Sequence, residues 1–248
     1  MKALLRLSVA VLATAFLAQG LRAQTESAPS PAAPDPAVAA ASPASAPAKL
    51  LYKPPAGAGN MPTRVSGGAR GGSTDASLLA LVPEHAALTT RAQPSLFWFQ
   101  SKPAKASLEV TLVEPKKAKP LLALKSEIAK KGGIQRVKLA EHKIELQPNV
   151  TYEWAVAIVP DAANRSQDVI AKGTIKRVDP PADLARNIES MEPAERAAAY
   201  AQSGIWYDAL EAISNAVDAH PDDASLRAQR ASLLKQVGLS QAADADKR

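Results

Sequence analysis

The segment from Gly67 to Thr74, GGARGGST, carries the residue types closest to a phosphate-binding loop. Its G-x4-G spacing and trailing Ser-Thr fit a loop whose backbone N–H groups surround phosphate oxygens. The Lys that would reach the phosphates is missing, because Ser73 stands at that place, and no convincing strand precedes the segment. The motif therefore does not predict a nucleotide site.

No other catalytic or metal-binding motif is complete in the sequence. The segment GAGNMP lacks the third Gly of a dinucleotide fingerprint, and neither H-E-x-x-H nor G-x-S-x-G occurs. His85, His142 and His220 lie far apart without the spacing of metal ligands, and there is no Cys. We therefore expect no catalytic residue, no metal site and no cofactor. A hydrolase whose site assembles only in the folded chain is the less favoured alternative.

Residues 1–23 predict a secretory signal peptide. Lys2 and Arg6 provide a positively charged start, and a 12-residue apolar run from Leu7 to Ala18 follows. This run is too short to span a membrane comfortably, and Ala23 or Gly20 offers a small residue for cleavage. We expect a periplasmic or secreted protein without stable membrane insertion after cleavage. An uncleaved anchor is the alternative.

A linker separates the predicted signal peptide from the folded part. Residues 24–50 are dominated by Pro, Ala and Ser, with Val38 as the only large aliphatic residue before Leu50. Such a composition cannot bury a core, which predicts a disordered tether. Gly and Pro continue through residues 51–77, which we interpret as a Gly/Pro-rich segment.

Residues 78–179 predict a β-sandwich. Short apolar runs alternate with breakers, and each of the following reads as a strand: LLALVP, SLFWFQ, SLEVTLVE, IQRVKLA, HKIELQ, TYEWAVAIV and DVIAKGTIKRV. Large apolar residues recur with period two from Leu108 to Leu112 and from Tyr152 to Ile158, which places them on one sheet face. About seven strands at short intervals favour a sandwich. Only the stretch from Pro120 to Gly133 also fits a helix.

The stretch LQPNVTYEW suggests an immunoglobulin-like or fibronectin-III-like sandwich. Its Leu, Pro and Tyr spacing resembles a tyrosine corner, in which the Tyr hydroxyl bonds to upstream backbone. We therefore predict structural roles for Tyr152 at the corner and for Trp154 between the sheets.

Two other aromatic pairs are candidate interaction residues. Phe97 and Phe99 lie on the opposite strand face from Leu96 and Trp98, so both faces cannot contact one core. Trp206 and Tyr207 begin a predicted helix, and such aromatics are frequent anchors at protein interfaces. The alternative is that each pair fills a contact inside the protein.

Residues 180–248 predict a helical tail. One helix begins near Pro193 and ends at Gly204, a second runs from Trp206 to Ala219, and a third starts at Asp222 or Asp223 and ends at Gly238. The register resembles about one and a half tetratricopeptide repeats, fewer than a free-standing array needs. The residues that carry this register are Ala197, Tyr200, Ala209, Ile213, Ala216 and Pro221.

The order of several short motifs resembles the bacterial family named domain of unknown function 928, whose members are mostly secreted or periplasmic. The resemblance covers about Tyr52 to Leu239. Some relatives carry a Cys after the Gly-Arg-Gly segment, where this chain has Gly72-Ser73. The family implies no established activity, catalytic residue or cofactor. The matching residues are Tyr52–Pro55, Gly67–Gly71, Leu79–Glu84, Leu88–Thr90, Gln93–Pro94, Phe97–Trp98, Gly133–Ile134, Val150–Trp154, Arg165–Ser166, Asp168, Gly173, Gly204–Leu210 and Val237–Leu239.

The charges are unevenly distributed along the chain. Residues 102–143 hold 11 basic and 4 acidic residues, whereas residues 179–248 hold 7 basic and 12 acidic residues. The two regions could contact each other, or each could contact a partner of its own. The alternative is that both are solvated surfaces whose charges keep the protein in solution. No nucleic-acid-binding signature accompanies the basic stretch, so we expect no nucleic-acid partner.

These features favour an uncharacterised, non-enzymatic protein–protein interaction module of the cell envelope. The expected partner is another envelope or secreted protein. The alternative is an envelope polysaccharide-binding protein that uses Phe97, Phe99 and the lysine-rich hairpins. Salt would separate these two readings, because polymer held by lysines is released by moderate salt whereas an apolar protein contact persists.

Overall fold

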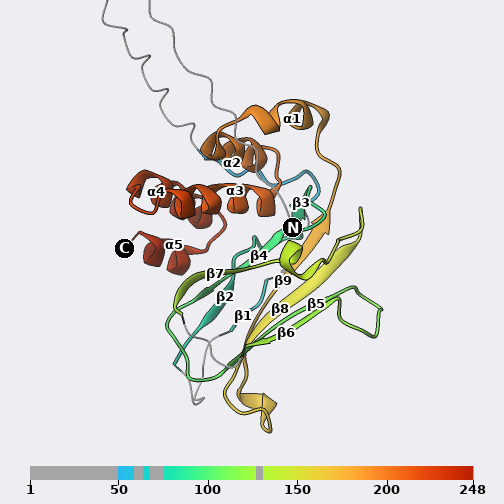
Figure 1. The fold of residues 1–248 in the computed structure, drawn as a ribbon, viewed down its shortest axis with the longest axis vertical. Helices are drawn as coiled ribbons and strands as arrows, with labels where there is room; N and C mark the ends of the chain where they lie inside the picture. Colours follow the sequence, from blue (N-terminus) through green and yellow to red (C-terminus); the bar gives the residue numbers. More distant parts are fainter. Residues whose placement is uncertain (1–49, 59–63, 68–74, 127–130, 248) are drawn as a thin grey trace, which may run out of the picture. The chain divides into compact units, whose positions relative to one another are not determined.

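The structure is a computed structural model that describes residues 50–58, 64–67, 75–126 and 131–247 (Figure 1). The predicted signal peptide, the linker up to residue 49 and most of the GGARGGST segment lie outside these residues. Within the described ranges, no helix has the length and apolar character needed to cross a membrane.

Nine strands in the described residues form two sheets. The four-stranded sheet is antiparallel, with the order β1 (Ser66–Gly67), β2 (Leu78–Ala80), β4 (Ser95–Gln100) and β7 (Gly133–Lys138). In the five-stranded sheet, the first two strands are parallel and the remaining pairs are antiparallel. Its order is β3 (Ala87–Thr89), β9 (Val169–Arg177), β8 (Thr151–Val159), β5 (Ser107–Val113) and β6 (Leu122–Ser126).

Two segments differ from what their sequence suggests. Residues 142–147, predicted as a strand, hold none, because the short 3-10 helix η1 (Leu139–His142) ends there and Lys143 adopts a left-handed φ of 56°. The turn is closed by Ile144 N–H, which bonds the Leu139 carbonyl at 3.1 Å. The ambiguous stretch from Pro120 to Gly133 contributes strand β6, because its apolar residues pair with β5.

Five helices follow the sheets in the described chain. They are α1 (Ala182–Asn187), α2 (Pro193–Gln202), α3 (Trp206–Ala219), α4 (Ala224–Gln236) and α5 (Ser240–Asp246). The three predicted helices are confirmed as α2, α3 and α4, with Asp223 as the cap that accepts from two backbone N–H groups of α4. Gly204 and Gly238 end α2 and α4 with φ of 76° and 77°, a conformation that glycine adopts without steric cost.

The space between the sheets is filled by the apolar positions that alternate along β5 and β8. Leu112, Trp154, Val156 and Ile158 are buried, as their period of two predicts. Gly173 of β9 lies opposite Trp154, and a side chain there would meet the indole Nε1 at 3.0 Å. The absence of a side chain at Gly173 therefore leaves room for the Trp154 ring.

Tyr152 makes the bond expected of a tyrosine corner. Its ring is buried, and its hydroxyl accepts a hydrogen bond from the Gln147 backbone N–H at 3.0 Å. The same loop is held from the other side by Arg177, whose Nη1 donates to the Leu146 carbonyl at 2.9 Å. These contacts fix the connection that leads into β8.

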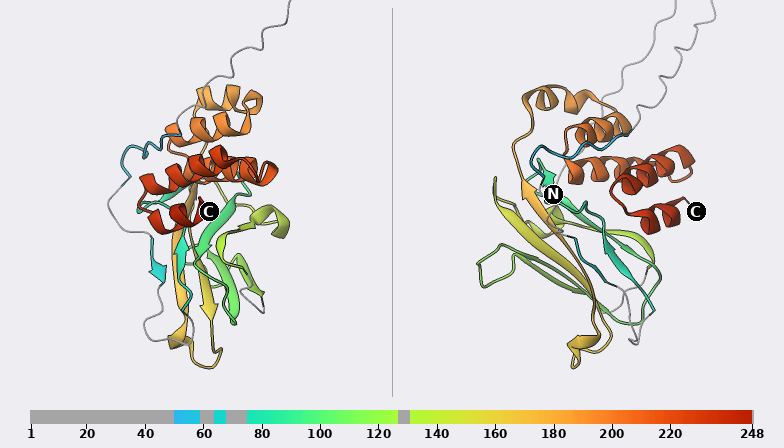
Figure 2. Two further views of the ribbon diagram at one scale, coloured as in Figure 1. Left: turned by 90° about the vertical axis from the view of Figure 1, so that its left-hand side faces the viewer. Right: turned by 180° about the vertical axis from the view of Figure 1, so that it is seen from behind.

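The helices form a layer beside the four-stranded sheet (Figures 1 and 2). Helix α3 lies against β3 and β4, and α5 lies against β7. This layer explains the strand SLFWFQ, which is buried along its full length. One face of β4 meets the other sheet, and its opposite face, with Phe97 and Phe99, is covered by helices.

All four candidate interaction aromatics are buried within the protein, so the alternative of contacts inside the protein holds and a role as exposed interaction residues does not. Trp206 and Tyr207 are 0% exposed, Phe97 is 1% exposed and Phe99 is 3% exposed. The reason is the position of α3, which packs between the sheet strands β3 and β4 and the helices α2 and α4, so that most of its residues are buried. The aromatics therefore dock the helical layer and offer no surface to a partner.

Polar contacts fix the direction of α3 on the sheets. Asp208, 1% exposed, accepts bonds from the hydroxyls of Thr89 and Thr90 and from the Thr90 backbone N–H at 2.9 Å. Burial raises the pKa of Asp208, and the three donors oppose that rise. One turn later, Glu211 accepts from the Ser95 hydroxyl at 3.0 Å.

Candidate binding cleft

The N-terminal described residues form a strap, Leu50–Ala58, across the helical layer. Lys53 N–H bonds the Ala201 carbonyl of α2 at 3.0 Å. Gln236 at the end of α4 holds the strap twice, because its Oε1 accepts from Tyr52 N–H at 2.8 Å and its Nε2 donates to the Leu50 carbonyl at 2.9 Å. The strap is therefore part of the fold.

The side chain of Tyr52 connects the strap to the loop that joins β2 to β3. Its ring stacks on His85 at 6.0 Å between centroids and meets the edge of Trp206 at 5.0 Å. Burial strongly raises the pKa of Tyr52, so its hydroxyl stays neutral across the physiological range.

The Ala86 carbonyl determines the proton position on His85. The His85 Nδ1 lies 3.2 Å from the Ala86 carbonyl, and its Nε2 lies 3.2 Å from the Tyr52 oxygen. Because a carbonyl can only accept, Nδ1 carries the proton and Nε2 accepts from the hydroxyl. Both ring nitrogens therefore have a hydrogen-bond partner within the protein.

Arg64 connects the same β2–β3 loop to the turn between α4 and α5. Its Nη1 donates to the Val82 carbonyl at 3.0 Å and to the Val237 carbonyl at 2.9 Å. Its Nη2 pairs with Glu84 Oε1 at 3.0 Å. The Arg64 side chain is 10% exposed, so it acts as an internal clamp beneath these two segments.

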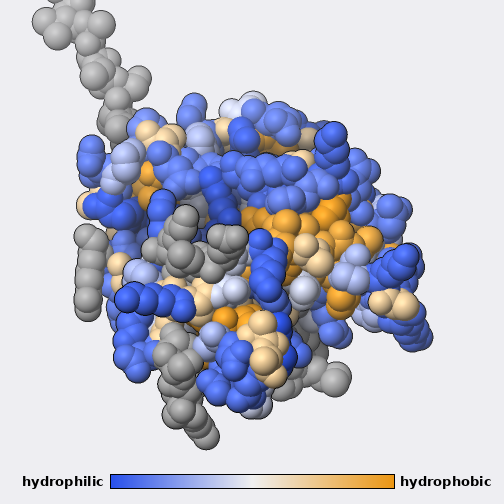
Figure 3. Space-filling model, turned by 60° about the horizontal axis from the view of Figure 1, so that its bottom comes forward, coloured by the Kyte–Doolittle hydropathy of each residue, from blue (hydrophilic) through white to orange (hydrophobic). Residues whose placement is uncertain are grey.

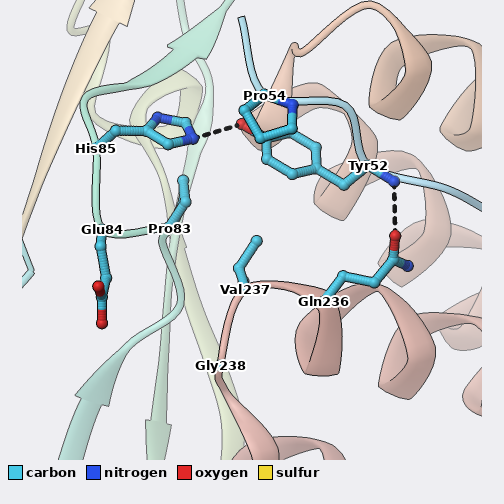
Figure 4. A pocket seen from close by; sticks show the side chains of 8 residues that line it. All are labelled: Tyr52, Pro54, Pro83, Glu84, His85, Gln236, Val237 and Gly238. Carbon is cyan, nitrogen blue, oxygen red and sulfur yellow. Dashed lines mark hydrogen bonds between the residues drawn. The ribbon is translucent and has the colours of Figure 1, made fainter. Parts of the chain in front are cut away.

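A cleft of about 390 Å³ opens between the strap, the β2–β3 loop and the α4–α5 turn. We call it the Tyr52 cleft, and it is lined by Tyr52, Pro54, Pro83, Glu84, His85, Gln236, Val237 and Gly238 (Figure 4). Figure 4 shows Tyr52 and Pro54 along one side, His85 and Glu84 on another, and Val237 with Gln236 on the third.

The chemistry of the Tyr52 cleft suits binding. Its proline rings and Val237 offer apolar surface, while Glu84 and Gln236 are exposed hydrogen-bonding groups at its rim. Among the residues that the structure describes, no group of three or more His, Cys, Asp or Glu is arranged to hold a metal ion. The walls are held from beneath by Arg64 and Trp206, so the shape of the cleft is preformed.

The underside of the molecule carries an apolar area bordered by hydrophilic side chains (Figure 3). In the described chain, the large hydrophobic residues that are exposed are Leu51, Val65 and Leu121, at 53%, 50% and 39%. They come from three separate segments, and single exposed apolar residues are ordinary on protein surfaces. They do not make up a second cleft.

None of the four aromatics predicted as interaction residues lines the Tyr52 cleft. Trp206 supports it from behind by contact with the Tyr52 ring. Phe97 lies at a separate hollow of about 80 Å³, where the Arg136 guanidinium stands over its ring at 5.9 Å. No catalytic or binding motif in the sequence pointed to the residues that line the Tyr52 cleft. Three segments that contribute to the cleft were nevertheless among those that resemble the family, namely Tyr52–Pro55, Leu79–Glu84 and Val237–Leu239.

The fold and its cleft define a protein of two β-sheets with a helical C-terminal layer. The sequence model of the family described as Domain of Unknown Function (DUF928) matches residues 65–246. The chain therefore belongs to this family, which confirms the resemblance of its motifs. No curated protein matches the sequence.

Two solved structures show a weak likeness. Astrotactin-2, described as a conserved vertebrate-specific and perforin-like membrane protein involved in neuronal development, gives a TM-score of 0.28 at 12% identity, over 70% of this chain and 34% of that chain. This chain thus spans about a third of that structure. A multi-domain immunophilin from Arabidopsis thaliana gives 0.16 at 7% identity, over 73% and 95%. Both scores are too low to carry an argument.

Proposed function

We propose that this protein is a secreted or periplasmic, non-enzymatic interaction module of the cell envelope. It binds an extended segment of another envelope or secreted protein in the Tyr52 cleft. One observation carries the proposal: Tyr52–Pro55, Leu79–Glu84 and Val237–Leu239, far apart in sequence, converge on a single open cleft. The location rests on the signal-peptide pattern of residues 1–23.

The geometry of the cleft favours a peptide segment over a reacting substrate. Its apolar walls can accept a side chain, and the carboxylate of Glu84, 73% exposed at its side chain, can accept from a partner's backbone N–H. The Tyr52 hydroxyl that bonds His85 Nε2 belongs to a side chain only 7% exposed, and burial raises its pKa, so it is a poor nucleophile. A rigid, preformed wall lowers the entropic cost of binding.

The same proposal includes a finer description of the fold. The Tyr152 corner and the presence of two sheets support an immunoglobulin-like or fibronectin-III-like sandwich. The short connection between α2 and α3, the packing of these two helices on each other and the following helices α4 and α5 support a tetratricopeptide-like tail. On this view the tail is a docked structural layer that also supplies one wall of the cleft.

Capture from envelope extract tests the proposal. The full mature chain is compared with Pro54→Arg and Val237→Arg, which place a charge in the cleft, and with Ala56→Arg, an exposed strap position outside it. We expect one protein to bind the wild type and Ala56→Arg and to be lost with both cleft variants. A synthetic peptide from that protein should reproduce this pattern with the purified chain.

Other outcomes would contradict the proposal in distinct ways. Retention of polysaccharide alone, equal in all variants and released by moderate salt, would favour a polysaccharide-binding protein that uses exposed lysines such as Lys116 and Lys119. Turnover of an ester, peptide or glycoside would establish a hydrolase. Deleting the helices is not a usable control, because it would expose the sheet surfaces that Trp206 and Tyr207 cover.

A further inference from the structure

A second cavity lies away from the Tyr52 cleft, between α1, the following 3-10 helix η3 (Ile188–Ser190), α2 and the loop after β3. Its volume is about 440 Å³, within the range of small-molecule sites. One wall is apolar and consists of Pro180, Leu184, Ala185 and Ile188. We call this cavity the α1 pocket.

Two opposite charges line the α1 pocket. Arg91 is 41% exposed at its side chain, and its guanidinium lies 3.9 Å from the buried carboxylate of Glu211. Glu189 is exposed on η3. The pocket therefore presents one cation and one anion beside its apolar wall.

Tyr200 lines the same pocket as Arg91 and Glu189, and both charges act on its hydroxyl. Burial and the negative charge of Asp208 raise the pKa of Tyr200; the positive charge of Arg91 and a hydrogen bond with Thr90 lower it, and the negative charge of Glu189 raises it. Each charge therefore lies close enough to act on this one hydroxyl. Tyr200 is itself 6% exposed and lines the pocket.

We propose that the α1 pocket binds a small zwitterionic ligand with an apolar side chain, namely a free apolar amino acid or a short peptide with both termini free. Arg91 pairs with the ligand carboxylate, Glu189 pairs with its ammonium group, and the side chain packs on Leu184 and Ile188. A guanidinium matches a carboxylate in two parallel hydrogen bonds, which gives this end its specificity.

Charge balance favours a zwitterion over a singly charged ligand. A lone anion on Arg91 would face the carboxylates of Glu189 and Glu211 and that of Asp208, which accepts from Thr90. A lone cation on Glu189 would face Arg91. The apolar wall adds affinity only when the ligand also carries a hydrophobic group. The proposal is independent of the function proposed for the Tyr52 cleft, because the two sites share no lining residue.

Calorimetric titration of the full mature chain tests the ligand class. The probes are leucine and leucyl-leucine, which distinguish a free amino acid from a short peptide, together with the N-acetylated and the C-amidated form of each. We expect one of the two zwitterions to bind and its capped forms to bind about tenfold more weakly, since each cap removes a charged partner. Equal binding of the capped and free ligands would overturn the proposal, as would no binding by any probe up to about 10 mM.

Variants assign the two ends of the ligand. In Arg91→Gln the penalty for capping the carboxylate should disappear while the penalty for capping the amine remains, and Glu189→Gln should show the reverse. Arg186→Gln and Glu192→Gln, exposed charges of the same region outside the pocket lining, are the matched controls. Penalties that persist in both pocket variants would place the ligand elsewhere.

A steric variant separates occupation of the pocket from a change in folding. Ala185 is an exposed residue of the pocket wall, so Ala185→Trp fills the cavity without disturbing the core. We expect this variant to keep its unfolding temperature and to lose binding, whereas Ala182→Trp on the same helix should bind normally. Undiminished binding by Ala185→Trp would refute the assignment.

Discussion

The indole Nε1 of Trp154 donates a hydrogen bond to the hydroxyl of Tyr207 at 2.7 Å, inside the protein. Trp154 belongs to strand β8 and Tyr207 to the first turn of α3, so this bond links the five-stranded sheet to the helical layer. The same hydroxyl donates to the Thr174 carbonyl of β9 at 2.9 Å. One phenol therefore satisfies two buried polar groups of the sheet.

Tyr207→Phe should destabilise the protein by about 1 to 3 kcal/mol, because the indole N–H and the Thr174 carbonyl both lose their partner while the ring packing is kept. Urea unfolding of wild type and variant measures the change. A cycle with Trp154→Phe isolates the bond, since the double variant should lose less than the sum of the two single changes. Strict additivity would show that the two side chains are not coupled.

Asp208→Ala should cost about 2 to 4 kcal/mol in the free energy of unfolding, because three donors from Thr89 and Thr90 would be left without their acceptor. Denaturant unfolding provides the measurement, with Asp222→Ala as an exposed control on the same helical layer. Equal stability of the two variants would mean that the Asp208 carboxylate does not hold α3 on the sheet.

Glu109 gives the protein an acid-sensitive contact between β5 and the loop before β9. Arg165 donates to both carboxylate oxygens of Glu109, at 3.2 and 2.8 Å, and this bonding lowers the pKa of Glu109. A carboxyl group with a lowered folded-state pKa stabilises the fold above its ordinary value of about 4.3 and loses that contribution as the pH falls through the folded-state pKa.

Glu109→Gln should therefore be less stable than wild type near neutral pH and should approach it on acidification. Unfolding measured between about pH 7 and about pH 3 tests this convergence. Glu145→Gln, an exposed position, is expected to show a constant offset over the same range. A gap between Glu109→Gln and wild type that widens in acid would contradict the assigned direction.

Gly173→Ala should destabilise the sheet by about 1 to 3 kcal/mol, because the new methyl group would meet Trp154 Nε1 and Val82 Cγ2, both at 3.0 Å. Neither neighbour is the free end of a flexible chain. Thermal unfolding beside Lys172→Ala, its exposed neighbour on β9, measures the effect. An unchanged unfolding temperature would show that the packing around Trp154 can relax.

Local patterns predicted much of the secondary structure. The alternation from Tyr152 to Ile158 places large side chains on one strand face independently of the rest of the fold. Strand β8 could therefore be predicted from the sequence. The helix from Trp206 to Ala219 is confirmed with the predicted bounds because Gly204 and Pro221 interrupt the pattern on either side. By contrast, β3 and α1 are too short for periodicity, and their positions depend on neighbours.

The fate of the aromatic pairs could not be read from sequence. The strand SLFWFQ has apolar side chains on both faces, which is equally compatible with a surface patch or with a covered sheet. Only the packing of α3 and α5 shows that Phe97 and Phe99 are covered and that Trp206 supports the Tyr52 cleft. The cleft itself joins residues up to 186 positions apart through contacts such as Gln236 to Leu50.

By itself the sequence determined the signal-peptide pattern, the order of sheet and helix segments and the family, because each depends on neighbouring residues along the chain. The tertiary structure alone decided which aromatics are buried and where the Tyr52 cleft and the α1 pocket form. Those features depend on side chains from distant segments, such as Arg91 and Glu189, which only the packing of helices on the sheets brings to one place.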